Sequence, residues 1–258
     1  MTSSSCDAPE LLVDASSRSP ARLTTGVLCH GFNMQALDVD HVLWGNPTLN
    51  TLGRVPKAAL VALQLNASLL LFGTGASFSD VGHVVEAEYA RRMLEDPLRL
   101  RAFRGHFDAF ADDELLALRS KCELELTSLN TVQEIRAAAK IFVSRKIERL
   151  VLVSSNTHAP RCLRDASVVL AELAGSSAES ADDRAAFFRL SQNLLVSPSD
   201  VPYLNATPQM VQIVEPPHRP DTLVSFDRHV ARFFKVPRER HAELAAQIDA
   251  LLRDQFNV

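Results

Sequence analysis

The sequence predicts an α/β fold: a mostly parallel sheet of about five strands flanked by helices, with a helical insertion and a C-terminal helix. Short apolar runs end at glycine, serine or threonine, and a segment with helical periodicity follows each of them. The 258 residues are 47% hydrophobic and 22% charged, which is typical of a globular chain and excludes collagen-like, coiled-coil and disordered classes. This length suits one large domain.

In the first half of the chain, apolar runs and turn residues define the elements. Pro56 stands where a first-turn proline is tolerated, and Gly73 stops a continuous apolar run of the kind buried on both faces of a sheet. We therefore expect a helix over 22–35, a strand over 39–44, a helix over 57–65, a strand over 69–72 and a helix over 82–94.

In the second half, residues 97–121 mix arginine with phenylalanine and predict an inserted helical segment. We further expect strands over 122–127, 149–153 and 192–197, helices over 131–143 and 160–173, a linker over 175–183 and a helix over 227–256. The predicted organisation is a flexible tail over 1–20 and a single α/β domain over 21–258, whose C-terminal helical extension covers 226–256.

Charge and cysteine usage restrict the partners and the compartment. The net charge of −4 argues against nucleic-acid or anionic-membrane binding. The four cysteines have no C-x-x-C spacing and fit a reducing cytoplasm, and the first 20 residues do not form a signal peptide. The most apolar window, 58–72, is too short to cross a bilayer. We expect a cytoplasmic protein without nucleic-acid or membrane partners.

Glycine and small polar residues mark the candidate site. Five of the nine glycines fall between residues 45 and 82. The loops 45–46, 73–77, 128–131 and 154–158 each precede a predicted helix, so they are expected at the carboxyl edge of the sheet, where helix N-termini favour anions. Arg54, Arg161 and His158 lie near helix starts. The pattern indicates a small anionic ligand, phosphorylated or of nucleotide size.

Simpler interpretations exist for several of these residues. The Gly73–Gly75 turn matches neither a dinucleotide fingerprint nor a Walker loop, and a tight strand exit explains it equally well. Residues 131–134 fit a capping box, the favoured interpretation there. Glu86 is either solvated, paired with Arg91 or functional. For His158 we favour a function over capping. The histidine spacing predicts no metal site.

The order of these motifs resembles the YdcF/SanA/ElyC-type family over about residues 37–200. The matching pieces are Trp44-Gly45 with Arg54, Phe72-Gly73-Thr74-Gly75, Val85-Glu86-Ala87, the segment 127–134 and the segment 153–161. The chain departs from the family at Thr74, at Ile135 and in its long 97–121 insertion. The resemblance implies a Rossmann-like sheet with a polar pocket at its carboxyl edge. It also implies S-adenosylmethionine binding, as associated with the soluble YdcF branch.

We therefore expect an enzyme, a hydrolase or transferase, acting on a phosphorylated or nucleotide-like small molecule, with His158 and Glu86 as acid/base residues. The alternatives are a non-catalytic nucleotide or S-adenosylmethionine binder, and an interaction module using 97–121; self-association into a homo-oligomer is left open. A covalent route through Ser155 or Cys162 is not favoured, since Ser155 lacks a nucleophile elbow and packing explains Cys162. The expected ligand-binding residues are Gly45, Asn46, Arg54, Gly73, Thr74, Gly75, Ser128, Asn130, Thr131, Glu134, Ser154, Ser155 and Arg161.

Overall fold

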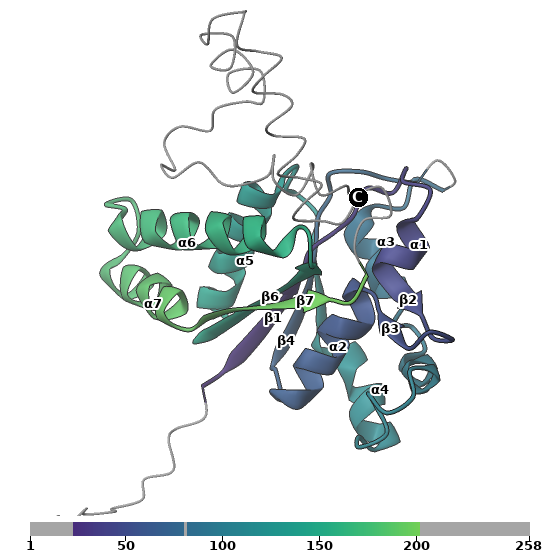
Figure 1. The fold of residues 1–258 in the computed structure, drawn as a ribbon. Helices are drawn as coiled ribbons and strands as arrows, with labels where there is room; N and C mark the ends of the chain where they lie inside the picture. The colour runs from purple at the N-terminus through teal and green to yellow at the C-terminus, as the bar shows by residue number, and fades with distance from the viewer. Residues whose placement is uncertain (1–22, 80–81, 202–258) are drawn as a thin grey trace, which may run out of the picture.

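A five-stranded parallel sheet forms the centre of the protein (Figure 1). A computed structural model describes residues 23–79 and 82–201. The sheet order is β5-β4-β1-β6-β7, and every neighbouring pair is parallel. Its strands are β1 (Thr25–Cys29), β4 (Leu69–Gly73), β5 (Cys122–Glu125), β6 (Arg149–Ser155) and β7 (Leu194–Ser199). The α/β, Rossmann-like fold class is thereby confirmed.

Helices cover both faces of the sheet (Figure 1). On one face, α1 (Val39–Trp44), α2 (Arg54–Gln64), α3 (Glu86–Arg92), the 3-10 helix η1 (Pro97–Ala102) and α4 (Asp112–Lys121) share a core with Val27 and Phe72. On the other face, α5 (Thr131–Ser144), α6 (Ala159–Gly175) and α7 (Ala181–Gln192) pack on Leu28 and Leu71. Successive strand residues point to opposite faces, so both cores need apolar runs.

The first two predicted elements were wrong. The helix expected over 22–35 is the central strand β1, which pairs with both β4 and β6 and is buried along its whole length. The strand expected over 39–44 is helix α1, which buries Val42 and Leu43. It leads into a small antiparallel hairpin of β2 (Gly45–Asn46) and β3 (Thr51–Leu52). The first parallel strand therefore ends at Cys29, not at Gly45.

Most later elements match the prediction. Strands occupy 69–73, 122–125, 149–155 and 194–199, and helices begin near Arg54, Thr131 and Ala159. Helix α3 is shorter than the predicted 82–94, and the helix α7 was missed beyond the predicted linker. The 97–121 segment contains η1 and α4. The tail over 1–20 and the helix over 226–256 lie outside the described residues.

The sheet order places a topological switch point between β1 and β6. From β1 the chain crosses to β4 and β5 on one side, and later to β6 and β7 on the other. Helices of the two layers diverge above such a point, so ligands bind there at the carboxyl ends of the strands. Across the described residues, no helix is long and apolar enough to cross a membrane.

Candidate functional site

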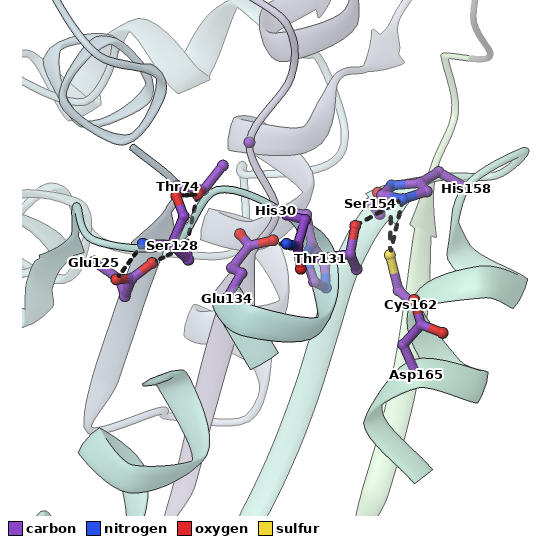
Figure 2. A network of polar contacts seen from close by, with 12 residues as sticks. His30, Thr74, Glu125, Ser128, Thr131, Glu134, Ser154, His158, Cys162 and Asp165 are labelled. Atoms are coloured by element: carbon purple, nitrogen blue, oxygen red, sulfur yellow. Dashed lines mark hydrogen bonds and ion pairs between the residues drawn. The ribbon is translucent and has the colours of Figure 1, made fainter. Parts of the chain in front are cut away.

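Polar side chains form a buried row along the carboxyl edge of the sheet (Figure 2). They come from the last residues of β5 and β6, from the segments that follow β1, β4 and β5, and from the starts of α2, α3 and α5, and they meet across the switch point. Burial of so many polar groups is costly unless they are paired, so each group requires a structural or chemical reason. The buried polar residues of this edge are His30, Arg54, Thr74, Glu86, Glu125, Ser128, Thr131, Glu134, Ser154 and Ser155.

His30 and Glu134 form an ion pair at the centre of the row. His30 directly follows β1, and its Nδ1 lies 2.7 Å from Oε2 of Glu134 on the first turn of α5. Burial disfavours the imidazolium, but interactions with Cys162 and Glu134 outweigh it and raise the pKa of His30 to about 10. His30 therefore carries its proton at neutral pH.

Two atoms of this pair have unused hydrogen-bonding capacity. His30 Nε2 and Glu134 Oε1 are buried and make no hydrogen bond with any described residue. Unpaired buried polar atoms are rare in folded proteins because each costs about 1–3 kcal/mol. His30 Nε2 is therefore the open donor of this pair, whereas Glu134 Oε1 packs against Gly73.

His158 is the second imidazole of the edge and lies just before α6. Ser154 Oγ is 2.9 Å from its Nδ1, and Thr131 Oγ1 is 3.5 Å from its Nε2. Burial lowers the pKa of His158 to about 2, with further contributions from the charges of Arg54, His30 and Arg161. His158 is therefore a neutral imidazole at physiological pH.

The two imidazoles lie against each other in opposite protonation states. Their ring centroids are 6.0 Å apart in an edge-on arrangement. His30 faces a carboxylate, whereas His158 is surrounded by positive charge. Environments that push the pKa values of neighbouring groups apart are typical of sites that carry out acid/base chemistry.

Glu86 opens helix α3 and is buried, so the solvated alternative for this residue was wrong. Its Oε1 accepts a hydrogen bond of 2.5 Å from Ser77 Oγ. Burial raises the pKa of Glu86, and the Ser77 hydrogen bond only partly opposes the shift. A Cβ added to Gly31 would lie 2.2 Å from Glu86 Oε2, so this carboxyl packs directly on the residue after His30. Glu86 is thus biased towards its protonated, proton-donating form.

Arg54 is a fully buried cation at the start of α2. Its Nε donates to Ser155 Oγ at 3.0 Å, and its Nη1 donates to the carbonyl oxygens of His30, at 3.2 Å, and Gly31. The guanidinium also lies 5.1 Å from the centroid of the Phe32 ring. Arg54 therefore fixes the exit of β1 and supplies positive charge beneath both histidines.

The loops after β4 and β5 are joined by a chain of hydroxyl groups. Thr74 Oγ1 lies 2.6 Å from Ser128 Oγ, which in turn donates to Glu125 Oε2. The other oxygen of Glu125 accepts from Thr127 N at 2.8 Å and from Ser128 N at 3.1 Å. The carboxylate of Glu125 thus folds the loop that leads into α5.

The Gly73–Gly75 turn is a close packing of protein against protein. A Cβ on Gly73 would lie 2.1 Å from Glu134 Oε1, and one on Gly75 would lie 2.0 Å from the Leu126 carbonyl oxygen. Both distances are impossible for real Cβ atoms. The tight strand exit that we considered as an alternative accounts for both glycines.

Gly45, Asn46 and Glu134 have roles different from those expected. Gly45 and Asn46 do not end a parallel strand: they form β2, and Asn46 Oδ1 accepts from the Thr48 and Leu49 amides. The capping box expected over 131–134 was also wrong, because the N-cap of α5 is Asn130, which accepts from Gln133 N at 3.0 Å. Glu134 is thereby free to turn inward towards His30.

Arg161 is the exposed cation of the edge. Its side chain is 43% exposed, and its Nε lies 3.6 Å from Oδ2 of Asp165, one turn further along α6. Arg164 pairs with the same carboxylate at 2.5 Å. Of the two arginines predicted for the site, Arg54 is buried, so Arg161 is the one that a ligand can reach.

Sequence reasoning missed His30, Gly31 and Glu125, and it placed Ser77 in the site loop 73–77 without assigning it a contact. His30 and Gly31 were missed because the strand before them was assigned to a helix, although the run of Val27, Leu28 and Cys29 ended by His-Gly is itself a strand signal. Glu125 is the last residue of β5, whose polar and apolar residues alternate, and nothing in that local pattern predicts that its side chain is buried.

Among the described residues, no group of three or more histidine, cysteine, aspartate or glutamate side chains is arranged to hold a metal ion.

Comparisons with family models, with curated proteins and with solved structures find no match for this chain.

Proposed function

We propose that the protein is an enzyme acting on a phosphorylated or nucleotide-like small molecule at the carboxyl edge of the sheet. One observation carries the proposal: His158, held neutral, and Glu86, biased towards protonation, flank the His30–Gly31 segment. Positive charge from Arg54, His30 and Arg161 contributes to the low pKa of His158, so a bound anionic substrate raises that pKa and strengthens the imidazole as a base for an attacking nucleophile. A protonated Glu86 donates a proton to a leaving group. The edge thus offers a base and an acid together.

The electrostatics of the same edge support an anionic substrate. The N-termini of α5 and α6, helices of 14 and 17 residues, border it and contribute the partial positive charge of a helix start. Arg161 supplies an accessible cation and Arg54 a buried one, while Glu134 balances the charge of the protonated His30. A phosphoryl group carries the charge and the acceptor oxygens that match these donors.

The resemblance to the YdcF/SanA/ElyC-type family remains part of this proposal. It rests on Thr131 and Glu134 in one motif and His158 and Arg161 in the other, and these residues lie at the adjoining N-terminal ends of α5 and α6. Under the alternative, the same edge binds a nucleotide or S-adenosylmethionine without turnover. A cytoplasmic location likewise stays a prediction.

Turnover assays with defined probes test the proposal. Full-length protein is incubated with para-nitrophenyl phosphate, bis(para-nitrophenyl) phosphate, ADP and S-adenosylmethionine, and products are separated by chromatography. We expect His158→Gln and Glu86→Gln to lower the rate by about 100-fold or more, as loss of a general base or acid does. His106→Gln, on the segment between η1 and α4, serves as the matched control.

The outcomes separate the two candidate functions. Hydrolysis by wild type that His158→Gln abolishes, at an unchanged melting temperature, supports the enzyme. Calorimetric binding of ADP or S-adenosylmethionine without product supports the binding protein. Equal rates for wild type and His158→Gln would exclude His158 as the base.

A further inference from the structure

A cavity of about 290 Å³ lies where the ends of α3 and α4 meet the start of the edge strand β5. Helices α3 and α4 cover the same face of the sheet (Figure 1). The 97–121 segment supplies one wall of the cavity, and none of the residues predicted for the carboxyl edge takes part. The residues that line the cavity are Arg91, Leu94, Glu95, Arg119, Ser120 and Cys122.

Arg91 brings a buried donor without a partner to this cavity. Its Nε is buried and forms no hydrogen bond with any described residue. Glu86, the partner considered from the sequence, bonds to Ser77 instead. The adjacent Arg92 pairs with Glu88 at 2.6 Å. Because buried donors in folded proteins almost always have a partner, the open Nε points to a polar group inside the cavity.

The other polar groups of the lining show that the missing partner is an acceptor. Ser120 Oγ donates to the Ala117 carbonyl oxygen at 2.8 Å, and Cys122 Sγ donates to the Leu118 carbonyl oxygen at 3.2 Å. The hydroxyl and thiol protons are therefore already used, and the two guanidinium groups are the donors that remain. A guanidinium group donates but never accepts, and its strongest partners are oxyanions.

The charges of Arg91 and Arg119 act on the same part of the cavity. Both lower the pKa of the Cys122 thiol, although burial outweighs them and raises it to about 12. Both arginines lie on the last turns of their helices, where a basic side chain offsets the helix dipole. The helix dipole accounts for their positions, but it does not account for a buried Nε that has no partner.

Glu95 restricts which anion fits. Its side chain lines the same cavity, and an ionised carboxylate accepts hydrogen bonds but cannot donate them. An oxyanion that retains a proton can donate to this carboxylate while its other oxygens face the arginines. Hydrogen phosphate retains a proton at neutral pH, whereas sulfate does not. The cavity is also smaller than the pockets of drug-sized ligands, which begin at about 300 Å³, so it suits a small anion rather than a nucleotide.

We propose that this cavity is a second binding site, which holds hydrogen phosphate between the guanidinium groups of Arg91 and Arg119 with its hydroxyl group directed at Glu95. The inference goes beyond the proposed function, because the site shares no residue with the carboxyl edge and requires no turnover. It also gives the 97–121 insertion a role in binding, since Arg119 belongs to that segment.

Footprinting of Cys122 in the full-length protein locates the bound anion. The Kd of inorganic phosphate is measured by calorimetry, and iodoacetamide, an uncharged reagent, is then added at alkaline pH. Peptide mass spectrometry gives the modified fraction of Cys122. Phosphate at about ten times its Kd should slow the modification by about 10-fold, because only the empty site reacts. Chloride at the same ionic strength should not change the rate. Phosphate that binds without protecting Cys122, or that does not bind, overturns the proposal.

Arginine variants assign the donors. Arg91→Gln and Arg119→Gln should each weaken phosphate binding by about 10-fold or more and remove the protection of Cys122, because each loses a charge-assisted hydrogen bond. Arg92→Gln is the matched control, since its side chain is 48% exposed and pairs with Glu88 outside the cavity. Protection that persists in both cavity variants overturns the proposal.

Arg161→Gln separates this site from the carboxyl edge. The variant removes the accessible cation of that edge, so it should weaken any phosphate bound there and leave the protection of Cys122 unchanged. If Arg161→Gln alone abolished the protection, the anion would lie at the carboxyl edge and the second site would be overturned. Failure of the turnover assays would leave the expected protection unchanged.

Sulfate tests the role of Glu95. It should bind about 10-fold more weakly than phosphate to wild type, because it has no proton to donate to the carboxylate. Glu95→Gln should remove this difference, since the amide group of glutamine can donate to either anion. Equal affinities of the wild-type protein for sulfate and phosphate would overturn the assignment of hydrogen phosphate.

Discussion

Replacing Gly73 with alanine should break the ion pair between His30 and Glu134, although neither of these two residues is substituted. Gly73 is the last residue of β4, and a Cβ there would lie 2.1 Å from Glu134 Oε1 and 2.7 Å from its Cγ and Cδ. The Glu134 side chain has to move away from such a methyl group. Because its other oxygen holds His30 Nδ1 at 2.7 Å, that movement separates the pair.

The expected cost follows from the loss of this buried pair. Leaving one member of a buried pair without its partner destabilises a protein by about 3–5 kcal/mol. If Glu134 retained its place, overpacking would instead cost about 1–3 kcal/mol. We expect about 3–5 kcal/mol for Gly73→Ala, measured as a lower urea midpoint at pH 7 with an unchanged m-value. Gly175→Ala is the control, because no atom lies within 4 Å of its added Cβ.

A double-mutant cycle tests the reason for the cost. Once Glu134→Ala has removed the obstructing side chain, Gly73→Ala should cost less than about 1 kcal/mol, a coupling of about 2–4 kcal/mol. Gly75→Ala should cost the same in both backgrounds, because its Cβ would meet the Leu126 carbonyl oxygen at 2.0 Å. If Gly73→Ala were equally costly with and without Glu134, the reasoning would be refuted.

Two further predictions concern Arg54 and His158. Arg54→Lys should lower the free energy of unfolding by about 2–4 kcal/mol, because one ammonium cannot replace the bonds to Ser155, His30 and Gly31, and an unchanged urea midpoint would contradict this role. His158 has a folded-state pKa of about 2, so below its unfolded value of 6.5 only the unfolded chain binds the proton and stability falls. Between pH 6.5 and 5, wild type should lose up to about 2 kcal/mol more than His158→Gln, and parallel losses in urea titrations would contradict the shift.

The parts of the fold that the sequence predicts correctly are those with strong local signals. The apolar runs of β4 and β6 are buried on both faces, and each stops at small residues. A buried parallel strand is the main interpretation of this pattern. Because parallel strands share one carboxyl edge, the correct strands also predict that the loops after β4, β5 and β6 meet. His158 and Thr131 lie within 3.5 Å for this reason.

The errors occur where the local pattern fits two structures. The α1 segment contains Val39, Val42 and Trp44, residues that are common in strands, and only its packing beside α2 makes it helical. The β1 strand is short and contains Gly26, which weakens its signal. Since β1 was missed, His30 at its exit was missed as well.

Glu134 shows a different limit of sequence reasoning. A glutamate three residues after a threonine fits a capping box, so a local explanation was sufficient. The structure assigns the cap to Asn130 and directs Glu134 towards a histidine 104 positions away in the chain. No local sequence pattern spans so many positions. Such a pair can be identified from the sequence only after the strand order is known.

The opposite pKa shifts of the two histidines follow from burial and from unlike charged neighbours. Arg54 bonds to the His30 carbonyl group, which leaves the ring of His30 directed at Glu134, and its charge lowers the pKa of His158. The same charge also lowers the pKa of Glu86, but burial exceeds it and the net shift is upward. The buried guanidinium at the β1 exit therefore adds to the effect of burial in lowering the pKa of His158, while burial raises the pKa of Glu86. His30 and His158 meet on this edge because β1 and β6 are neighbours whose following helices lie on opposite faces of the sheet.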